Sequence, residues 1–224
     1  MLYRRVLDYK KDLDQPYFIT VITVTTHQPY IDPVSKEMDI SKAVQFADQA
    51  LYDFYLKLEA QNYFDNGVLL VTSDHRAMMP MFDSEIDRLG NHAFSKIPLV
   101  VIGKAFEGRG MQSEYVQQSD LLNSMEYLTS KQHCARKDEG NLFSEPVKAA
   151  DCVYHSRGDY RDRIDVFCEN GSQYGQVQLN GDDTRLIAGE LADEESIIQF
   201  INASRIAAQQ RESAFQQALD NQNN

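Results

Sequence analysis

Apolar residues near the start of the chain first recur at helical spacing and then form a continuous run. The helical positions are Leu2, Val6, Tyr9 and Leu13. This spacing predicts a short amphipathic helix, and Pro16 ends it. Residues 17–24 carry no charge and are rich in Ile, Val, Thr and aromatic side chains. Such a composition predicts a central strand that is buried on both faces of a parallel sheet.

A long apolar stripe at helical spacing follows Asp39 and continues to about residue 62. It predicts a long helix with either Asp39 or Ser41 as the N-cap. Two more apolar runs, 67–73 and 97–103, predict buried strands joined by a long loop. A further helix is predicted after Ser119. Strands that alternate with helices in this way are typical of an α/β fold with a doubly wound, mostly parallel sheet.

The pattern changes after residue 130. Three short strands are predicted at 151–155, 165–169 and 176–179, with Asn170-Gly171 and Asn180-Gly181 as hairpin signals. From Asp193 the apolar residues return to helical spacing and predict a C-terminal helix. We therefore predict a larger domain over 1–130, followed at 131–224 by a small antiparallel β subdomain and a C-terminal helix.

Composition and charge argue against a nucleic-acid-binding surface and against a membrane-spanning segment within this sequence. The formal net charge is -12, which argues against a general nucleic-acid surface because such a surface requires clustered Lys and Arg. No apolar run approaches the roughly 20 residues that span a bilayer, and the first residues show no signal-peptide core. The three cysteines, Cys134, Cys152 and Cys168, lack a metal-binding CxxC spacing, and whether Cys152 pairs with Cys168 in an oxidising compartment stays open.

The strand predicted at 67–73 ends in Asp74 and His75. At a strand end, where the chain turns, both side chains can reach one ion, and a carboxylate oxygen with an imidazole nitrogen suits zinc or manganese better than calcium. The alternative is structural, because Asp74 can also cap the turn that follows. Neither residue type nor spacing decides between these two interpretations.

Two further histidines fall near strand ends. His27 follows the first predicted strand, and Pro29 forces an extended turn there. His92 lies just before the third predicted strand. Because ligands bind beyond the carboxyl ends of strands in doubly wound sheets, these residues strengthen the case for a site with Asp74 and His75. His133 and His155 lie among polar residues of the second half, where we expect surface positions without a role.

Several segments resemble, in the same order, the lipoteichoic acid synthase and phosphoglycerol transferase branch of the sulfatase and alkaline phosphatase superfamily. The resemblance covers roughly residues 10 to 130. The segments that carry it are Tyr17-Phe18-Ile19-Thr20 with Thr26-His27-Gln28-Pro29-Tyr30, Phe46-Ala47-Asp48-Gln49-Ala50-Leu51, residues 66–75, Ile97-Pro98-Leu99-Val100-Val101, and Ser119-Asp120-Leu121-Leu122. The resemblance implies that the chain is the C-terminal part of an alkaline-phosphatase-like catalytic domain.

By this resemblance, Asp74 and His75 are ligands of a manganese or zinc ion. His27 contacts the phosphoryl group of the substrate, and His92 is a weaker candidate for the same pocket. Arg76 stands where the family usually has Gly, so it either alters the turn or brings a guanidinium near a substrate phosphate. The family's N-terminal half, with its Thr or formylglycine nucleophile and the remaining ligands, has no counterpart in this chain.

The resemblance implies a two-step phosphoglycerol transfer, from an anionic phospholipid headgroup or another phosphoglycerol donor to a glycan or glycerol acceptor. The expected location is the periplasmic or extracellular face of the membrane, with anchoring through sequence outside this chain. Two alternatives remain: a sulfatase that hydrolyses sulfuric esters, or a non-catalytic lipid-binding or regulatory relative of the same fold.

Overall fold

The structure is a computed structural model that describes residues 2–112, 114–129, 140–144, 146–147, 149–156, 158, 160–181 and 183–222. The chain divides into two compact units, 1–110 and 111–224. Cys134 and His133 lie outside the described residues. The division at residue 130, which rests on the change of sequence pattern, stays a prediction.

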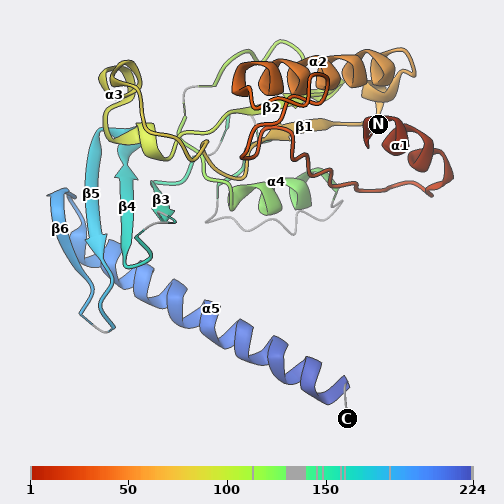
Figure 1. The fold of residues 1–224 in the computed structure, drawn as a ribbon. Helices are drawn as coiled ribbons and strands as arrows, with labels where there is room; N and C mark the ends of the chain where they lie inside the picture. Colours follow the sequence, from red (N-terminus) through yellow and green to blue (C-terminus); the bar gives the residue numbers. More distant parts are fainter. Residues whose placement is uncertain are drawn as a thin grey trace. The chain divides into compact units, whose positions relative to one another are not determined.

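The helices predicted for the first unit are present. Helix α1 (Leu2–Tyr9) continues into the short η1 (Lys10–Asp12), and α2 spans Ile40–Glu59 (Figure 1). Of the two candidate caps, the structure selects Asp39, whose side chain accepts a hydrogen bond from the backbone N–H of Lys42 at 3.0 Å. This hydrogen bond lowers the pKa of Asp39 and stabilises the first turn of α2.

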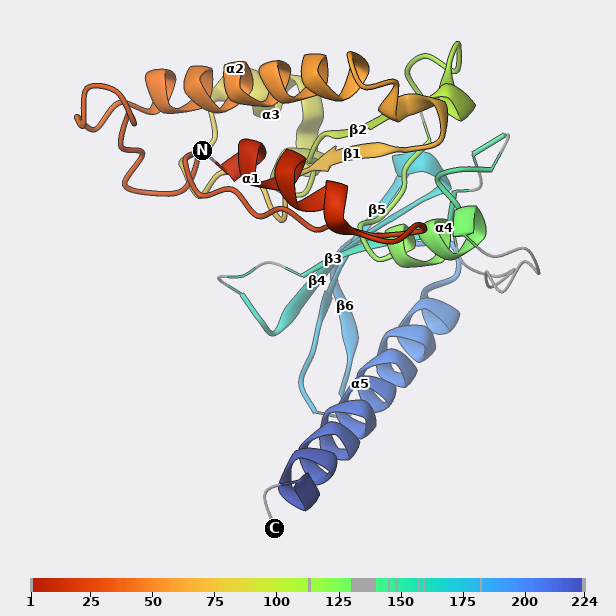
Figure 2. The same ribbon diagram turned by 90° about the vertical axis from the view of Figure 1, so that its right-hand side faces the viewer.

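The small core of this unit joins the two helices to the first strand. It consists of Leu7 of α1 with Phe54 and Leu58 of α2, and Leu69 packs against it. The same region contains two short helical turns, η2 (Tyr63–Asp65) and η4 (Lys104–Phe106). Helix α2 lies along the strands in both views (Figures 1 and 2).

The strands predicted at 67–73 and 97–103 are confirmed as β1 (Leu69–Thr72) and β2 (Leu99–Ile102). They pair antiparallel, with Leu69 opposite Ile102 and Thr72 opposite Leu99. A mostly parallel sheet was predicted for this half of the chain, whereas these two strands form an antiparallel pair. A parallel neighbour would need a crossover, whereas the segment between β1 and β2 folds back and returns the chain to the edge where β1 ends.

The predicted strand at 17–24 is also wrong. The segment belongs to no strand of the structure, and Phe18, Ile22 and Val24 are 73%, 79% and 73% exposed. Its composition is suited to a sheet, but a strand requires a hydrogen-bonding neighbour, and the described residues supply none here. Composition alone cannot show whether that neighbour is present.

The long loop between β1 and β2 contains helical structure that the sequence pattern did not predict. Helix α3 spans Asp83–Leu89, and η3 follows at Gly90–Phe94. The Glu85 side chain accepts a hydrogen bond from the backbone N–H of Phe82 at 3.1 Å, as the third residue of a capped helix does. With seven residues, α3 is too short to show a clear apolar period.

In the second unit, the predicted helix after Ser119 is confirmed as α4 (Asp120–Thr129). Its buried polar face is joined to the segment that begins at Gly140. Asn123 donates to the carbonyl of Gly140 at 2.9 Å, and the Ser124 hydroxyl accepts from the N–H of Leu142 at 2.9 Å. A Cβ at Gly140 would overlap the Asp120 carboxylate, so this close approach requires glycine.

The antiparallel section of the second unit is larger than predicted. Four strands pair in sequence order: β3 (Cys152–Ser156), β4 (Arg163–Cys168), β5 (Gln173–Gln178) and β6 (Arg185–Glu190). The first three correspond to the predicted strands, and β6 was not predicted. Asn170 and Gly171 adopt positive φ in η5 (Glu169–Gly171), between β4 and β5, as their hairpin signal indicated.

Helix α5 (Glu194–Gln222) confirms the predicted C-terminal helix. Ile197 and Ile201 in its first turns pack on the sheet against Val166 and Val177. The rest of the helix extends away from the sheet (Figure 1). Within the described residues, no helix has the length and apolar character needed to cross a membrane.

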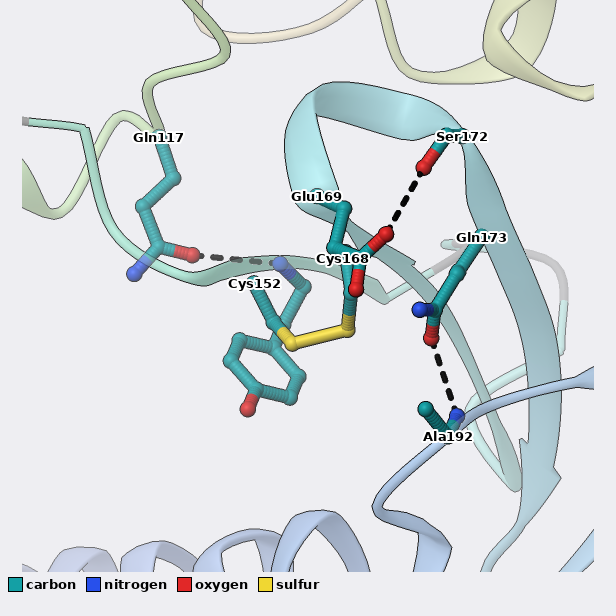
Figure 3. The surroundings of a disulfide bond; sticks show 8 residues. Gln117, Cys152, Cys168, Glu169, Ser172, Gln173 and Ala192 are labelled. Carbon is teal, nitrogen blue, oxygen red and sulfur yellow. Dashed lines mark hydrogen bonds between the residues drawn. A yellow bond between two sulfur atoms is a disulfide. The ribbon is translucent and has the colours of Figure 1, made fainter.

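A disulfide between Cys152 and Cys168 settles the question that the sequence left open (Figure 3). The two residues lie directly opposite each other on β3 and β4, and Cys168 is buried in the core of the sheet. Two hydrogen bonds near the disulfide connect the segments before α4 and after β6 to the sheet. They join the Gln117 side chain to the N–H of Tyr154 at 3.1 Å and the Gln173 side chain to the N–H of Ala192 at 2.9 Å.

Because the disulfide closes a loop with a sequence separation of 16, we expect its loss to destabilise the second unit by about 3 kcal/mol. Thermal unfolding of a Cys152→Ser/Cys168→Ser variant should show a melting temperature lower by roughly 10 °C. Dithiothreitol should lower the melting temperature of the unmodified chain and leave that of the variant unchanged. Equal melting temperatures with and without reductant for the unmodified chain would contradict the expectation.

Candidate functional site

Asp74 and His75 follow β1 after one intervening residue, Ser73, at the edge of the sheet where β2 begins. The Thr72 hydroxyl donates to the carbonyl of Pro98 at 3.0 Å and joins the two strands at this edge. The side chains of Asp74 and His75 are 85% and 51% exposed. The sequence therefore predicted correctly that both would stand at a strand end, where they are open to solvent.

The two side chains face a common point. Asp74 Oδ1 accepts the backbone N–H of His75 at 2.9 Å, and Asp74 Oδ2 lies 3.6 Å from His75 Nε2. His75 Nδ1 lies 2.6 Å from the carbonyl oxygen of Arg76. Because that carbonyl can only accept, Nδ1 carries the proton, and in the neutral ring Nε2 keeps its lone pair. The lone pair and Asp74 Oδ2 are thus both available on the same side of the turn.

This arrangement fits a divalent ion. An oxygen and a nitrogen that each bind a tetrahedral ion at about 2.1 Å are about 3.4 Å apart, close to the observed 3.6 Å. A ligating imidazole usually donates its other N–H to a carbonyl or carboxylate, as His75 does to Arg76. Among the described residues, no group of three or more His, Cys, Asp or Glu is placed to hold a metal. The described residues therefore place no third ligand of these types beside Asp74 and His75.

His27 lies in an exposed turn whose neighbour contacts the loop after His75. His27 Nδ1 is 2.6 Å from the carbonyl oxygen of Gln28, so its Nε2 also points away from the backbone. The side chain of Gln28 donates to the carbonyl of Met78 at 3.0 Å, across 50 residues of sequence. This hydrogen bond brings the His27 turn beside the loop that follows Asp74 and His75.

The guanidinium of Arg76 has partners within the loop. Nη1 donates to the carbonyls of Ala77 and Met79 at 2.9 and 3.0 Å, and Nη2 donates to Glu85 Oε2 at 2.6 Å. The side chain is only 18% exposed. Contact between Arg76 and a substrate phosphate stays a prediction, and such a contact would compete with Glu85.

Glu85 joins this loop to α3. The backbone N–H of Phe82, and then the guanidinium of Arg76, hold the pKa of Glu85 below its ordinary value. The same Oε2 atom accepts both hydrogen bonds. Glu85 therefore connects the first turn of α3 to the residue that follows His75.

Two other histidines were considered from the sequence. His92 lies in η3, which precedes β2, and its membership of the pocket stays a prediction. The expected surface position of His155 is wrong. It lies in β3 opposite Asp165, with its side chain 30% exposed and its Nδ1 3.6 Å from Asp165 Oδ2. Its strand is part of the sheet, so its side chain is partly covered.

A groove of about 410 Å³ lies in the first unit, but none of the candidate residues lines it. Its walls include Tyr55 and Glu59 of α2, Phe64 of η2, and Gly103 at the end of β2. Since Leu69 pairs with Ile102, the end of β2 is at the opposite edge of the sheet from Asp74. The chemistry-bearing residues, and not the groove, therefore define the candidate site.

Sequence reasoning missed Gln28 and Glu85. Gln28 is adjacent to His27, but its bond to Met78 depends on a contact across 50 residues, which no local pattern signals. Glu85 had one available signal, because an acidic residue at the third position of a helix often bonds back to the start of that helix. That signal was hidden because α3 itself was not predicted.

Comparisons with known proteins give a consistent assignment of fold. The family model described as Sulfatase matches residues 1–129. Lipoteichoic acid synthase 1 of Bacillus subtilis (strain 168) is 25% identical over 140 residues, which cover 53% of this chain and 21% of that protein. The crystal structure of a protein in the alkaline phosphatase superfamily from Vibrio parahaemolyticus matches with a TM-score of 0.53 and 20% identity, over 88% of this chain and 50% of that one.

The structural match confirms the predicted fold class: the chain is a partial alkaline-phosphatase-like α/β domain with antiparallel strands and a C-terminal helix. At 20% identity, this match shows the fold alone. The chain spans half or less of the length of these two relatives.

The lowered pKa of Glu85 predicts a pH-dependent contribution to stability. A carboxyl group whose pKa is lower in the folded state stabilises the fold above its unfolded pKa, near 4.5, and loses this contribution as pH falls through the folded pKa. Chemical unfolding of the unmodified chain and of Glu85→Gln should therefore differ most near neutral pH, and the difference should shrink in acid. A difference that is equally large at pH about 3 and about 7 would contradict this assignment.

Proposed function

The chain belongs to the sulfatase family, and on that basis we propose that it is the C-terminal part of a metal-dependent phosphoglycerol transferase. The observation that carries this proposal is the pair Asp74 Oδ2 and His75 Nε2, 3.6 Å apart at the end of β1. The turn that contains His27 lies beside the loop after this pair, because the Gln28 side chain donates a hydrogen bond to the carbonyl of Met78. The similarity to lipoteichoic acid synthase 1 favours phosphoglycerol as the transferred group.

In this proposal, Asp74 and His75 hold one side of a manganese or zinc ion. When bound, such an ion lowers the pKa of a nucleophile and neutralises charge on the transferred group. Because Nδ1 of His27 donates to the carbonyl of Gln28, Nε2 donates to a phosphoryl oxygen when the ring is an imidazolium, and in that form His27 orients this oxygen. A nucleophilic hydroxyl outside the described residues attacks the phosphorus of an anionic phospholipid and takes its phosphoglycerol group. The bond from phosphorus to the lipid oxygen breaks, and the lipid alcohol leaves with the proton of the nucleophile. The hydroxyl of a glycan or glycerol acceptor then attacks the same phosphorus, and its proton returns to the released nucleophile.

We further propose that additional polypeptide completes the sheet and supplies the remaining ligands. Apolar residues of strand type are left exposed in the first unit: Phe18, Ile22 and Val24 outside any strand, and Val100 in β2. Such residues favour burial between sheet neighbours. The part of the relatives that this chain does not match is the candidate source of that polypeptide.

The periplasmic or extracellular face of the membrane is the proposed location. The disulfide supports it, because such bonds persist in oxidising compartments. The similarity to lipoteichoic acid synthase 1 is consistent with it. Anchoring to the membrane is proposed to come from residues beyond those described.

The metal proposal is tested by NMR titration of the chain with ZnCl2. We expect the ring resonances of His75 to shift first, because Nε2 becomes a ligand, and we expect this response to disappear in Asp74→Ala. His155→Ala is the matched control, since it removes a histidine that also faces an aspartate but lies in the other unit. An unchanged His75 ring at millimolar zinc would contradict the proposed site and favour a non-catalytic relative.

Turnover by the chain is expected to stay at background, because the described residues bring no third His, Cys, Asp or Glu ligand to Asp74 and His75. The measurement is release of product from a glycerophosphodiester and from an aryl sulfate, in the presence of manganese or zinc. Turnover that is lost in Asp74→Ala would contradict the proposed incompleteness. In that case, a preference for the aryl sulfate would favour the second candidate function, a sulfatase, to which the matched family description points.

A further inference from the structure

Arg76 is unusually buried for an arginine beside a solvent-open site. Its side chain is 18% exposed, whereas those of Asp74 and His75 are 85% and 51% exposed. Its three hydrogen bonds all end on the protein: two on carbonyls of the next turn and one on Glu85. The guanidinium is therefore directed toward the loop carbonyls and Glu85.

These bonds restrain the peptide group that fixes the ring of His75. The carbonyl of Arg76 accepts the hydrogen bond from His75 Nδ1 at 2.6 Å, and the direction of this carbonyl follows from the backbone angles of Arg76 and Ala77. The guanidinium of Arg76 donates hydrogen bonds to the carbonyls of Ala77 and Met79 in the same turn. It also donates to the carboxylate of Glu85, which lies in α3. A shift of this turn would move the carbonyl and release the ring.

The same turn accepts two further hydrogen bonds. Gln28 donates to the carbonyl of Met78, between the two carbonyls that Arg76 holds. The N–H of Met79 donates to the carbonyl of Ala77 at 2.8 Å and closes the turn itself. Three consecutive carbonyl groups, those of Ala77, Met78 and Met79, are thus used as acceptors, which makes this turn a well-restrained support.

We propose that Arg76 and Glu85 form a positioning pair, which holds His75 in the Nδ1-protonated form with Nε2 directed toward the cation. This inference rests on the proposed function, because it assumes that His75 is a ligand. Partners that orient a ligating imidazole typically change metal affinity by about 10- to 100-fold when they are removed. Arg76 acts through the backbone and does not contact the ion.

The competing role for Arg76 is a direct contact with a substrate phosphate. Such a contact would require Nη2 to leave Glu85, and Oε2 of Glu85 would then keep the N–H of Phe82 as its donor among the described residues. A charge-assisted hydrogen bond of 2.6 Å on a partly buried side chain is stronger than an ordinary one. The observed contacts therefore favour positioning.

The experiment compares the unmodified chain with Glu85→Gln and Arg76→Gly. Long-range ¹H–¹⁵N spectra at pH about 8 report which nitrogen of the His75 ring carries a proton. Titration with ZnCl2 reports its affinity. We expect the Nδ1-protonated form to dominate in the unmodified chain, a mixture of tautomers in both variants, and zinc affinity lower by about 10-fold in both.

Glu59→Gln is the matched control. Glu59 also accepts one side-chain hydrogen bond of 2.6 Å within the first unit, from the hydroxyl of Tyr55, but it lies at the end of α2. The control should keep the tautomer and the affinity of the unmodified chain. Backbone amide spectra show whether each variant stays folded, and Glu85→Gln preserves the shape of the side chain if Arg76→Gly does not fold.

The outcomes separate the two proposals. If the unmodified chain shows no response of His75 to zinc, the metal site itself fails. If His75 binds zinc but its tautomer and affinity are the same in Glu85→Gln as in Glu59→Gln, the positioning role is overturned and the metal site stands. Equal or tighter zinc binding in Arg76→Gly, which restores the residue usual in the resembled family, would also overturn the positioning role.

Discussion

The antiparallel pairing of β1 with β2 determines where the chemistry-bearing residues of the first unit can lie. Because Thr72 stands opposite Leu99, the residues after β1 and those before β2 belong to the same edge of the sheet. The bond from Thr72 to Pro98 holds that edge together. Asp74 and His75 leave the sheet there, and α3 must lie within the connection that returns to β2. Every later feature of the site depends on this geometry.

From that edge outward, the site is organised around one turn. The carbonyls of residues 77–79 accept hydrogen bonds from Arg76, Gln28 and the turn itself. Each of the two histidines, His27 and His75, directs Nδ1 to the carbonyl of the residue that follows it. In both cases the side chain of that following residue is fixed to the same turn. The histidines are thus oriented by their neighbours while their Nε2 atoms stay accessible.

The second unit is stabilised by different means. Its four-stranded sheet packs Val166 and Val177 against α5, and the disulfide joins β3 to β4 at one end. Asp165, 1% exposed, accepts hydrogen bonds from Tyr174 and Gln176 at 3.0 Å each, so its charge is met by donors from the neighbouring strand. The disulfide of this unit suits an oxidising environment, which agrees with the proposed location.

The sequence by itself determined the features that depend on neighbouring residues. Helical spacing predicted α1, α2, α4 and α5, and hairpin signals predicted the turn between β4 and β5. The position of Asp74 and His75 at a strand end followed from the apolar run before them. Each of these predictions rests on residues a few positions apart, whose preferences act locally.

Only the tertiary structure decided which segments become neighbours. It paired β1 and β2 antiparallel, left 17–24 without a partner strand, and added α3 and β6. It also turned Arg76 toward Glu85 and brought Gln28 to Met78. Hydrogen bonds of this kind join residues 9 and 50 positions apart, and their formation depends on how the whole chain folds back on itself. The local sequence pattern cannot specify these long-range hydrogen bonds, because the same side-chain donors could instead bind other acceptors or water.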